Sequence, residues 1–193
     1  MSRPIRLAGM VLVALTVSTL AVAGDNRVNF VPWKVLEPGV EPPRKTFRLF
    51  WIPASSDEMR HSGLITSEGL TLYAGRCIGM HVVRADDGPM LVKLGARDEI
   101  PLAILFEGDR EVARVANQSG FLAAASVEAM VRRAFDTREV ALNTMLDRAS
   151  ERAASGEKAE AMALYRQIAV QGCAFPRLAR TAQRALRRLG VKE

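Results

Sequence analysis

The chain has 193 residues, of which 27 are Lys or Arg, 21 are Asp or Glu and 49% are hydrophobic. This balance excludes a disordered tail and a protein with several membrane spans. Its two cysteines are too few for a disulfide-dense scaffold or a four-thiolate zinc site, and no Gly-rich phosphate loop of the Walker type occurs. The length predicts one domain, or one domain with a helical appendage.

The first 23 residues have the pattern of a cleaved signal peptide. Arg3 and Arg6 form a short basic start, the run 7–22 carries no charge, and small residues end it at Ala21-Val22-Ala23. A retained membrane anchor is the alternative, but the apolar run is short for a span and contains Thr and Ser. We therefore expect a periplasmic or secreted protein, which argues against nucleic acid as a partner. Cleavage would lower the formal net charge from +6 to +4.

Residues 24–45 contain four prolines, which prevent a regular helix or a central strand. We expect an extended lead-in that Phe30 and Trp33 pin onto the following domain.

Residues 46–136 alternate between strand and helix patterns. The apolar, aromatic-rich run 46–52 predicts a strand buried on both faces. Gly108-Asp109 separates two further strand patterns and predicts a hairpin. The expected strands are 46–52, 80–85, 102–107 and 110–116, and the expected helices are about 57–75, 89–95 and 126–135. This alternation predicts an α/β domain with a sheet of mixed direction flanked by helices.

Residues 137–193 are rich in alanine and arginine and contain only helical spacing. Ser155-Gly156-Glu157 separates a first helix from a second. A third helix is expected from Pro176, a favourable first-turn residue, to Leu189, with Gly190 as its stop. We therefore expect an α-helical tail that begins at residue 137.

The segment 94–109 resembles the thioredoxin family, in which a short Gly-Val/Ile-Arg stretch leads to Ile-Pro, a buried strand and a tight hairpin. Here Gly95-Ala96-Arg97 is followed by Ile100-Pro101 and by the hairpin at Gly108-Asp109. The resemblance implies a thioredoxin-like fold over 46–136, with a cis-proline at Pro101 and 126–135 as the closing helix. It also implies an active site beside Pro101, just after the first strand.

Thioredoxins carry Cys-Gly-Pro-Cys at that site, where this chain has Ser55-Ser56-Asp57-Glu58. Serine cannot form the mixed disulfide of thiol exchange, and Glu58 cannot resolve one, so ordinary thioredoxin chemistry is excluded there. The Ser-x-x-Glu spacing predicts a capping box, in which Ser55 accepts from the Glu58 amide and Glu58 reaches back to the Ser55 amide. Alternatively, Ser55 is a hydrogen-bond donor in a ligand cleft formed with Glu58, Ile100 and Pro101.

The tail is similar to a tetratricopeptide-type helical pair, with Gly156, Ala161 and Tyr165 at spacings that resemble that repeat. Simple packing of small alanines around Tyr165 explains the same residues.

The two cysteines, Cys77 and Cys173, leave three readings open. We expect two unpaired, largely buried thiols; a disulfide that staples the tail to the domain and a redox-active thiol at Cys77 are the alternatives. His61 and His81 lack the neighbours for a metal site, and a Cys77–His81 pair lacks further ligands. We expect no metal and no cofactor.

Arginines at three- and four-residue steps, namely Arg177, Arg180, Arg184, Arg187 and Arg188, give the last helix a basic face. Such a stripe is more often the solvated face of a packed helix than a contact for anionic lipid or an acidic partner.

The sequence thus favours an exported, non-catalytic thioredoxin-like protein that acts in protein binding or assembly. The alternatives are a divergent thiol-disulfide oxidoreductase that uses Cys77, with or without Cys173, and a binder of a small ligand or peptide between Ser55 and Pro101.

Overall fold

The computed structural model describes residues 30–117 and 120–190. The expected signal peptide, 1–23, lies outside these residues, as does the start of the lead-in. Within the described ranges, no helix combines the length and the apolar character needed to cross a membrane.

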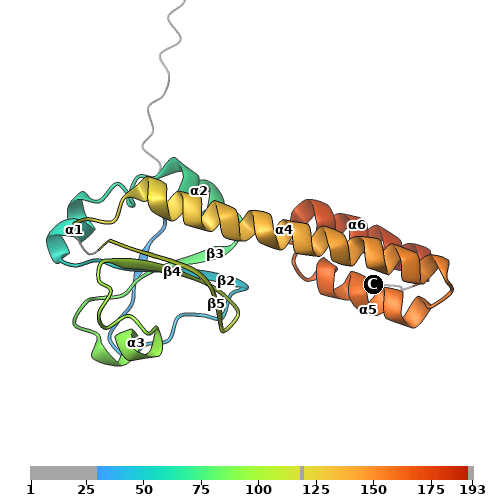
Figure 1. Ribbon diagram of the computed structural model, residues 1–193, viewed down its shortest axis with the longest axis horizontal. Coiled ribbons are helices and arrows are strands. Elements are labelled where there is room, and N and C mark those ends of the chain that lie inside the picture. Colours follow the sequence, from blue (N-terminus) through green and yellow to red (C-terminus); the bar gives the residue numbers. More distant parts are fainter. Residues whose placement is uncertain (1–29, 118–119, 191–193) are drawn as a thin grey trace, which may run out of the picture.

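Five strands of the described chain form one mixed sheet with the order β1-β3-β2-β4-β5 (Figure 1). β1, β2 and β3 are parallel, whereas β4 is antiparallel to both of its neighbours, β2 and β5. The predicted α/β class and the β4–β5 hairpin are confirmed. The strands are β1 (Lys34–Val35), β2 (Phe47–Ile52), β3 (Ile78–Val82), β4 (Leu102–Glu107) and β5 (Arg110–Ala116).

β2 is the central strand, and its side chains enter two separate cores. Phe47 and Trp51 point to the face that α2 (Glu68–Ala74) and α4 (Ala124–Ala154) cover, whereas Phe50 and Ile52 point to the face under α3 (Gly88–Lys93) (Figure 1). Successive side chains of a strand alternate between faces, so a strand that is apolar throughout must be covered on both. The expectation from the run 46–52 is therefore confirmed.

The helix expected over 57–75 is two helices, α1 (Ser56–His61) and α2. The Ser62 hydroxyl accepts from the Leu64 amide at 3.2 Å, and the Ser67 hydroxyl accepts from the Leu70 amide at 3.0 Å. Ser67 is the N-cap of α2, so these serines end one helix and start the next. The sequence pattern did not predict this break, because apolar residues recur at helical spacing both before and after it.

α4 is a single helix of 31 residues, and the boundary expected between 136 and 137 falls inside it. Its first half packs Val127, Val131 and Phe135 against the sheet, and its second half buries Leu142 and Ala149. Neither Gly nor Pro interrupts the sequence of α4, so the helix continues from the domain into the tail.

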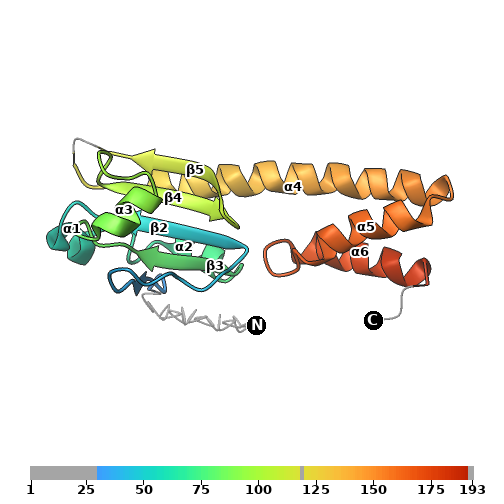
Figure 2. The same ribbon diagram turned by 90° about the horizontal axis from the view of Figure 1, so that it is seen from below.

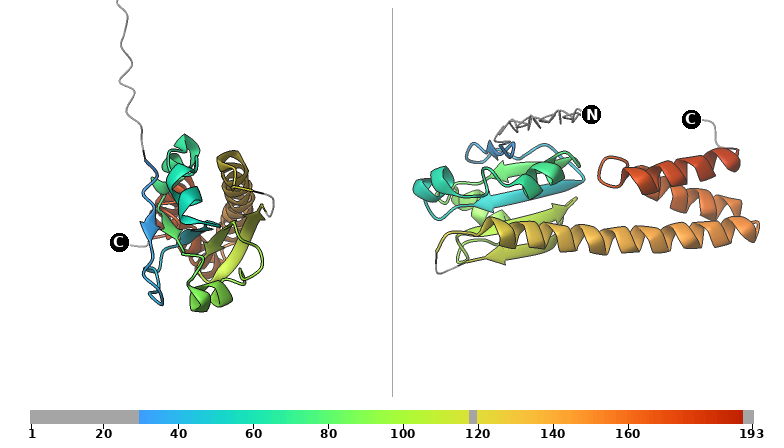
Figure 3. Two further views of the ribbon diagram at one scale, coloured as in Figure 1. Left: turned by 90° about the vertical axis from the view of Figure 1, so that its left-hand side faces the viewer. Right: turned by 90° about the horizontal axis from the view of Figure 1, so that it is seen from above.

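The tail consists of the second half of α4 together with α5 (Lys158–Ala169) and α6 (Pro176–Arg188). α5 packs on both α4 and α6, and the molecule is elongated along α4 (Figure 2). The right-hand view of Figure 3 shows α5 and α6 folded back beside the projecting end of α4. Gly156 has a φ of +84° between α4 and α5, a conformation that favours glycine. The predicted break at 155–157 is confirmed.

The lead-in runs along the edge of the sheet and supplies the short strand β1, which pairs with β3. Trp33 anchors it as expected: its Nε1 donates to the Leu64 carbonyl at 2.8 Å, and its ring lies 5.5 Å from that of Trp51. The expectation for Phe30 is wrong, since this side chain is 65% exposed while Val31 is buried. In an extended segment neighbouring side chains point to opposite sides, so Val31 and Phe30 cannot both face the core.

Candidate functional site

Pro101 lies at the end of the sheet where β2 runs into α1. The Ile100–Pro101 peptide bond is cis, as predicted. The β2–β4 register pairs Ile52 with Leu102, so Pro101, just before Leu102, is at the same end as Pro53, just after Ile52. Pro101 is buried and Ile100 is half-buried against the core under α3.

Ser55 and Glu58 fulfil only part of the predicted capping box. The Ser55 hydroxyl caps α1 by accepting from the Glu58 amide at 3.1 Å, as expected. The Glu58 carboxylate does not bond to the Ser55 amide: Oε2 accepts from the Ala54 amide at 2.7 Å, and Oε1 accepts from the Leu122 amide at 2.9 Å. Glu58 is fully buried and reaches one residue further back than the motif predicts.

The buried Glu58 side chain thus accepts hydrogen bonds from backbone amides near the start of α1. Two backbone amides hold its carboxylate, and one of them, Leu122, belongs to the loop before α4. Each carboxylate oxygen therefore has a hydrogen-bond partner, which offsets the cost of burying this polar group. No local pattern points to Leu122, so this bond could not be predicted from the sequence.

A hollow of about 340 Å³ lies beside Ser55. It adjoins the chain that follows the carboxyl ends of β2 and β3, where open α/β sheets generally bind ligands. An Arg84–Asp86 ion pair, 2.6 Å between Nη2 and Oδ2, forms part of its wall. Pro101 is not among its lining residues, so the cleft expected between Ser55 and Pro101 is instead a hollow between α1 and the loop after β3. The lining comprises Val35, Pro53, Ser55, Ser56, Met59, Arg84, Ala85 and Asp86.

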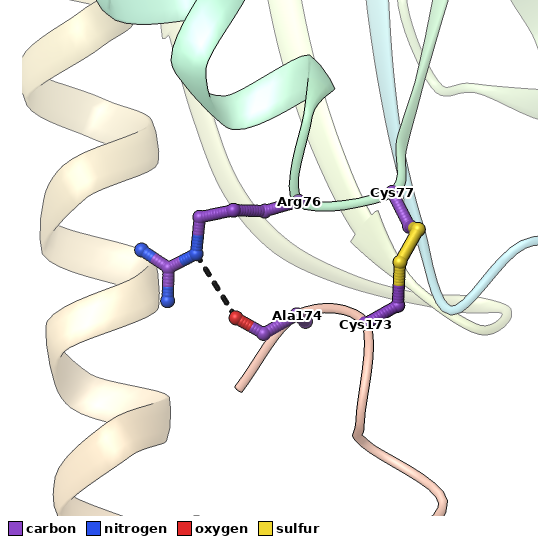
Figure 4. The surroundings of a disulfide bond; sticks show 4 residues. All are labelled: Arg76, Cys77, Cys173 and Ala174. Carbon is purple, nitrogen blue, oxygen red and sulfur yellow. Dashed lines mark hydrogen bonds between the residues drawn. A yellow bond between two sulfur atoms is a disulfide. The ribbon is translucent and has the colours of Figure 1, made fainter. Parts of the chain in front are cut away.

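Cys77 and Cys173 form a disulfide, with Cα atoms 5.8 Å apart across a sequence separation of 96 (Figure 4). The expectation of two unpaired, buried thiols is therefore wrong, and Cys173 is exposed. The bond arises because the turn between α5 and α6 packs against the turn that leads into β3. The spacing of the two cysteines along the sequence does not indicate that these two turns lie close together.

The disulfide and Pro101 lie at opposite ends of the sheet. Cys77 directly precedes Ile78, which pairs with Phe47 at the start of β2, whereas Pro101 is level with the end of β2. The structure therefore does not bring the two cysteines together with Ser55, Glu58 or Pro101.

Arg76, next to Cys77, forms a second link to the tail. Its Nε donates to the Ala174 carbonyl at 2.9 Å (Figure 4). Its guanidinium lies 4.7 Å from the centre of the Phe135 ring and 5.4 Å from that of Phe175. The Tyr73 ring is 5.7 Å away. Aromatic faces attract a cation, so Arg76 joins α2, α4 and the start of α6.

His81 is almost completely buried, and neither of its ring nitrogens has a hydrogen-bond partner within the described chain. Its pKa is lowered from 6.5 to about 4, chiefly by burial and to a smaller extent by the nearby cations Lys45, Arg48 and Lys34. His61 is exposed near Asp57 on α1. In residues 30–117 and 120–190, no three His, Cys, Asp or Glu side chains gather as metal ligands.

The last helix, α6, carries five arginines, and all of them are exposed: Arg177, Arg180, Arg184, Arg187 and Arg188.

No protein-family model and no curated protein sequence matches the chain.

Proposed function

We propose that this chain is an exported, non-catalytic protein of thioredoxin-like fold that acts in protein binding or assembly. The observation that carries the proposal is the bonding of Glu58. At the position where a thioredoxin needs its resolving thiol, a buried carboxylate is held by the amides of Ala54 and Leu122. This arrangement supplies no nucleophile for thiol exchange.

The thioredoxin-like assignment is supported by the order in which the parts occur. A buried strand, β2, leads into a capped helix, and the cis Ile100–Pro101 bond precedes a strand that is antiparallel to β2. The β4–β5 hairpin and the start of α4 then follow in the order that the resemblance implies. The tail resembles a tetratricopeptide pair in its α4–α5 hairpin, and we assign to it the contact with a partner.

Export is supported by the disulfide, since such bonds persist in oxidising compartments and are rare in the cytosol. The pair Cys77–Cys173 joins the domain to the tail, which suits a structural role.

The alternative of a thiol oxidoreductase is less favoured because the disulfide lies at the end of the sheet away from Pro101. Purified protein, exported natively, is expected to show no disulfide reductase or isomerase turnover. Turnover that the Cys77→Ser substitution abolishes would overturn the proposal in favour of this alternative.

The hollow beside Ser55 supports a second candidate function, the binding of a small ligand or peptide. Ser55 itself is exposed at its rim, and its hydroxyl can donate to a ligand while accepting from the Glu58 amide. A thermal-shift screen of small acids and short peptides tests this candidate. Hits that Ser55→Trp removes, and that the exposed control Ser150→Trp retains, would support it; hits that survive Ser55→Trp would contradict it.

A further inference from the structure

The basic face of α6 is the most concentrated charge among the described elements. The helix carries five arginines and no acidic residue. Steps of three and four residues place these side chains on one face of a helix with 3.6 residues per turn. The opposite face is buried, through Leu178, Ala182 and Leu186. We define the arginine stripe as Arg177, Arg180, Arg184 and Arg188, which together span about 16 Å along the helix axis.

The arginine stripe differs in its bonding from several arginines on and beside the sheet. Arg48, Arg114 and Arg138 each pair with a carboxylate of the α/β domain. Within the described residues no member of the stripe forms an ion pair, and the one hydrogen bond is from Arg184 to the Thr181 hydroxyl at 3.3 Å. Like charges at three- and four-residue steps repel each other. The stripe therefore concentrates positive charge that nothing in its own helix neutralises.

The base of α6 is held in a fixed place on the α/β domain. Cys173 is bonded to Cys77, and the Ala174 carbonyl accepts from Arg76. Phe175, directly before the helix, is buried among aromatic rings. These contacts orient the stripe in advance, so a partner would lose little free energy in ordering it.

We infer that the arginine stripe binds an acidic helix of a partner protein; the inference rests on the proposed role in protein binding. A guanidinium matches a carboxylate in a planar, two-bond geometry. Glutamates at alternating steps of four and three residues form a straight row that matches the stripe. A membrane surface fits less well, because a helix that lies in lipid needs an exposed apolar face, and Leu178, Ala182 and Leu186 are already buried.

The test uses a fluorescein-labelled, alanine-based helical peptide with glutamates at those steps, and the natively exported full-length protein. Fluorescence anisotropy measures the dissociation constant of the complex between peptide and protein at low and at physiological salt concentration. The variant Arg180→Gln/Arg184→Gln is expected to bind roughly tenfold more weakly than wild type. The control Arg97→Gln/Arg148→Gln removes the same charge from two exposed arginines outside α6 and is expected to bind as wild type does.

A peptide with glutamine in place of glutamate checks the role of the carboxylates and is expected not to bind. Equal weakening by the two double variants would overturn the stripe as a specific site. Absence of peptide binding, together with stripe-dependent binding to vesicles that contain phosphatidylglycerol, would also overturn it and favour lipid. Reductase turnover would overturn the proposed function but would leave the peptide result standing, so the two failures are distinguishable.

Discussion

The Glu58 carboxylate accepts a hydrogen bond from the amide of Leu122, 64 residues further along the chain, at 2.9 Å. The bond ties the first turn of α1 to the loop before α4. Since its other oxygen accepts from the Ala54 amide, Glu58 joins three segments at the end of the sheet where Pro101 lies. Glu58 is thus a structural centre at this end of the sheet.

Removal of the Glu58 carboxylate is expected to destabilise the protein strongly. Glu58→Ala leaves the buried Leu122 amide and the partly buried Ala54 amide without their acceptors, and should lower the free energy of unfolding by roughly 2–4 kcal/mol in urea denaturation. Ser55→Ala removes only the cap of α1 and should cost about 1 kcal/mol. A Glu58→Ala loss no larger than that of Ser55→Ala would contradict the bonding described here.

The contacts of Arg76 predict that it stabilises the junction between the domain and the tail. Arg76→Ala removes the bond to the Ala174 carbonyl and the stacking on Phe135 and Phe175, and should lower the free energy of unfolding by roughly 2–3 kcal/mol. Arg97 is an exposed arginine with no ion pair in the described chain, so Arg97→Ala should change it by at most about 0.5 kcal/mol. Equal effects of the two substitutions in urea denaturation would show that the aromatic contacts contribute nothing.

The buried imidazole of His81 predicts a loss of stability in acid. Its pKa is lowered from 6.5 to about 4 in the folded protein, chiefly by burial. As the pH falls through 6.5, the unfolded chain therefore binds a proton that the folded protein does not, and stability declines until about pH 4. The largest contribution from this one residue is about 3 kcal/mol.

His81→Leu is the matched test, because leucine fills part of the space with no titrating group. Chemical denaturation at pH 7, 5.5 and 4 should give a shallower decline for His81→Leu than for wild type. Parallel pH profiles would mean that the imidazole titrates alike in the folded and unfolded chain, contrary to this prediction.

Loss of the disulfide should destabilise the protein, because the bond closes a long loop and so restricts the conformations of the unfolded chain. The separation of 96 residues between Cys77 and Cys173 corresponds to about 4.7 kcal/mol in the chain-entropy description. The double variant Cys77→Ala/Cys173→Ala should therefore unfold at lower urea concentration than the oxidised wild type. Added reductant should shift the wild type toward the variant and leave the variant unchanged; an equal response of both proteins would contradict a structural bond.

Local patterns predicted much of the fold. The apolar run of β2, the Gly108-Asp109 turn and the Pro176 start of α6 depend on neighbouring residues, and each is where the sequence places it. Ile100-Pro101 was predicted from a resemblance, and the cis bond is present. The break at Ser62 was missed because hydroxyl capping competes with helix periodicity, which the hydrophobic spacing does not register.

The candidate site was less predictable because its main contacts join distant parts of the chain. Glu58 meets Leu122, and Cys77 meets Cys173, because elements far apart in the sequence pack side by side. The Ser55 cap, by contrast, spans three residues and follows from the sequence. Contacts between distant residues depend on tertiary packing, so the spacing of cysteines gives no connectivity.

The central claim is that the cysteines are structural and that no free thiol serves catalysis. It is tested most directly by counting alkylatable thiols in natively exported protein, unfolded in denaturant, before and after reduction. The account predicts no reactive thiol before reduction and two afterwards, since Cys77 and Cys173 are the only cysteines of the chain. Two reactive thiols before reduction would contradict the structural disulfide and would favour a redox role for Cys77.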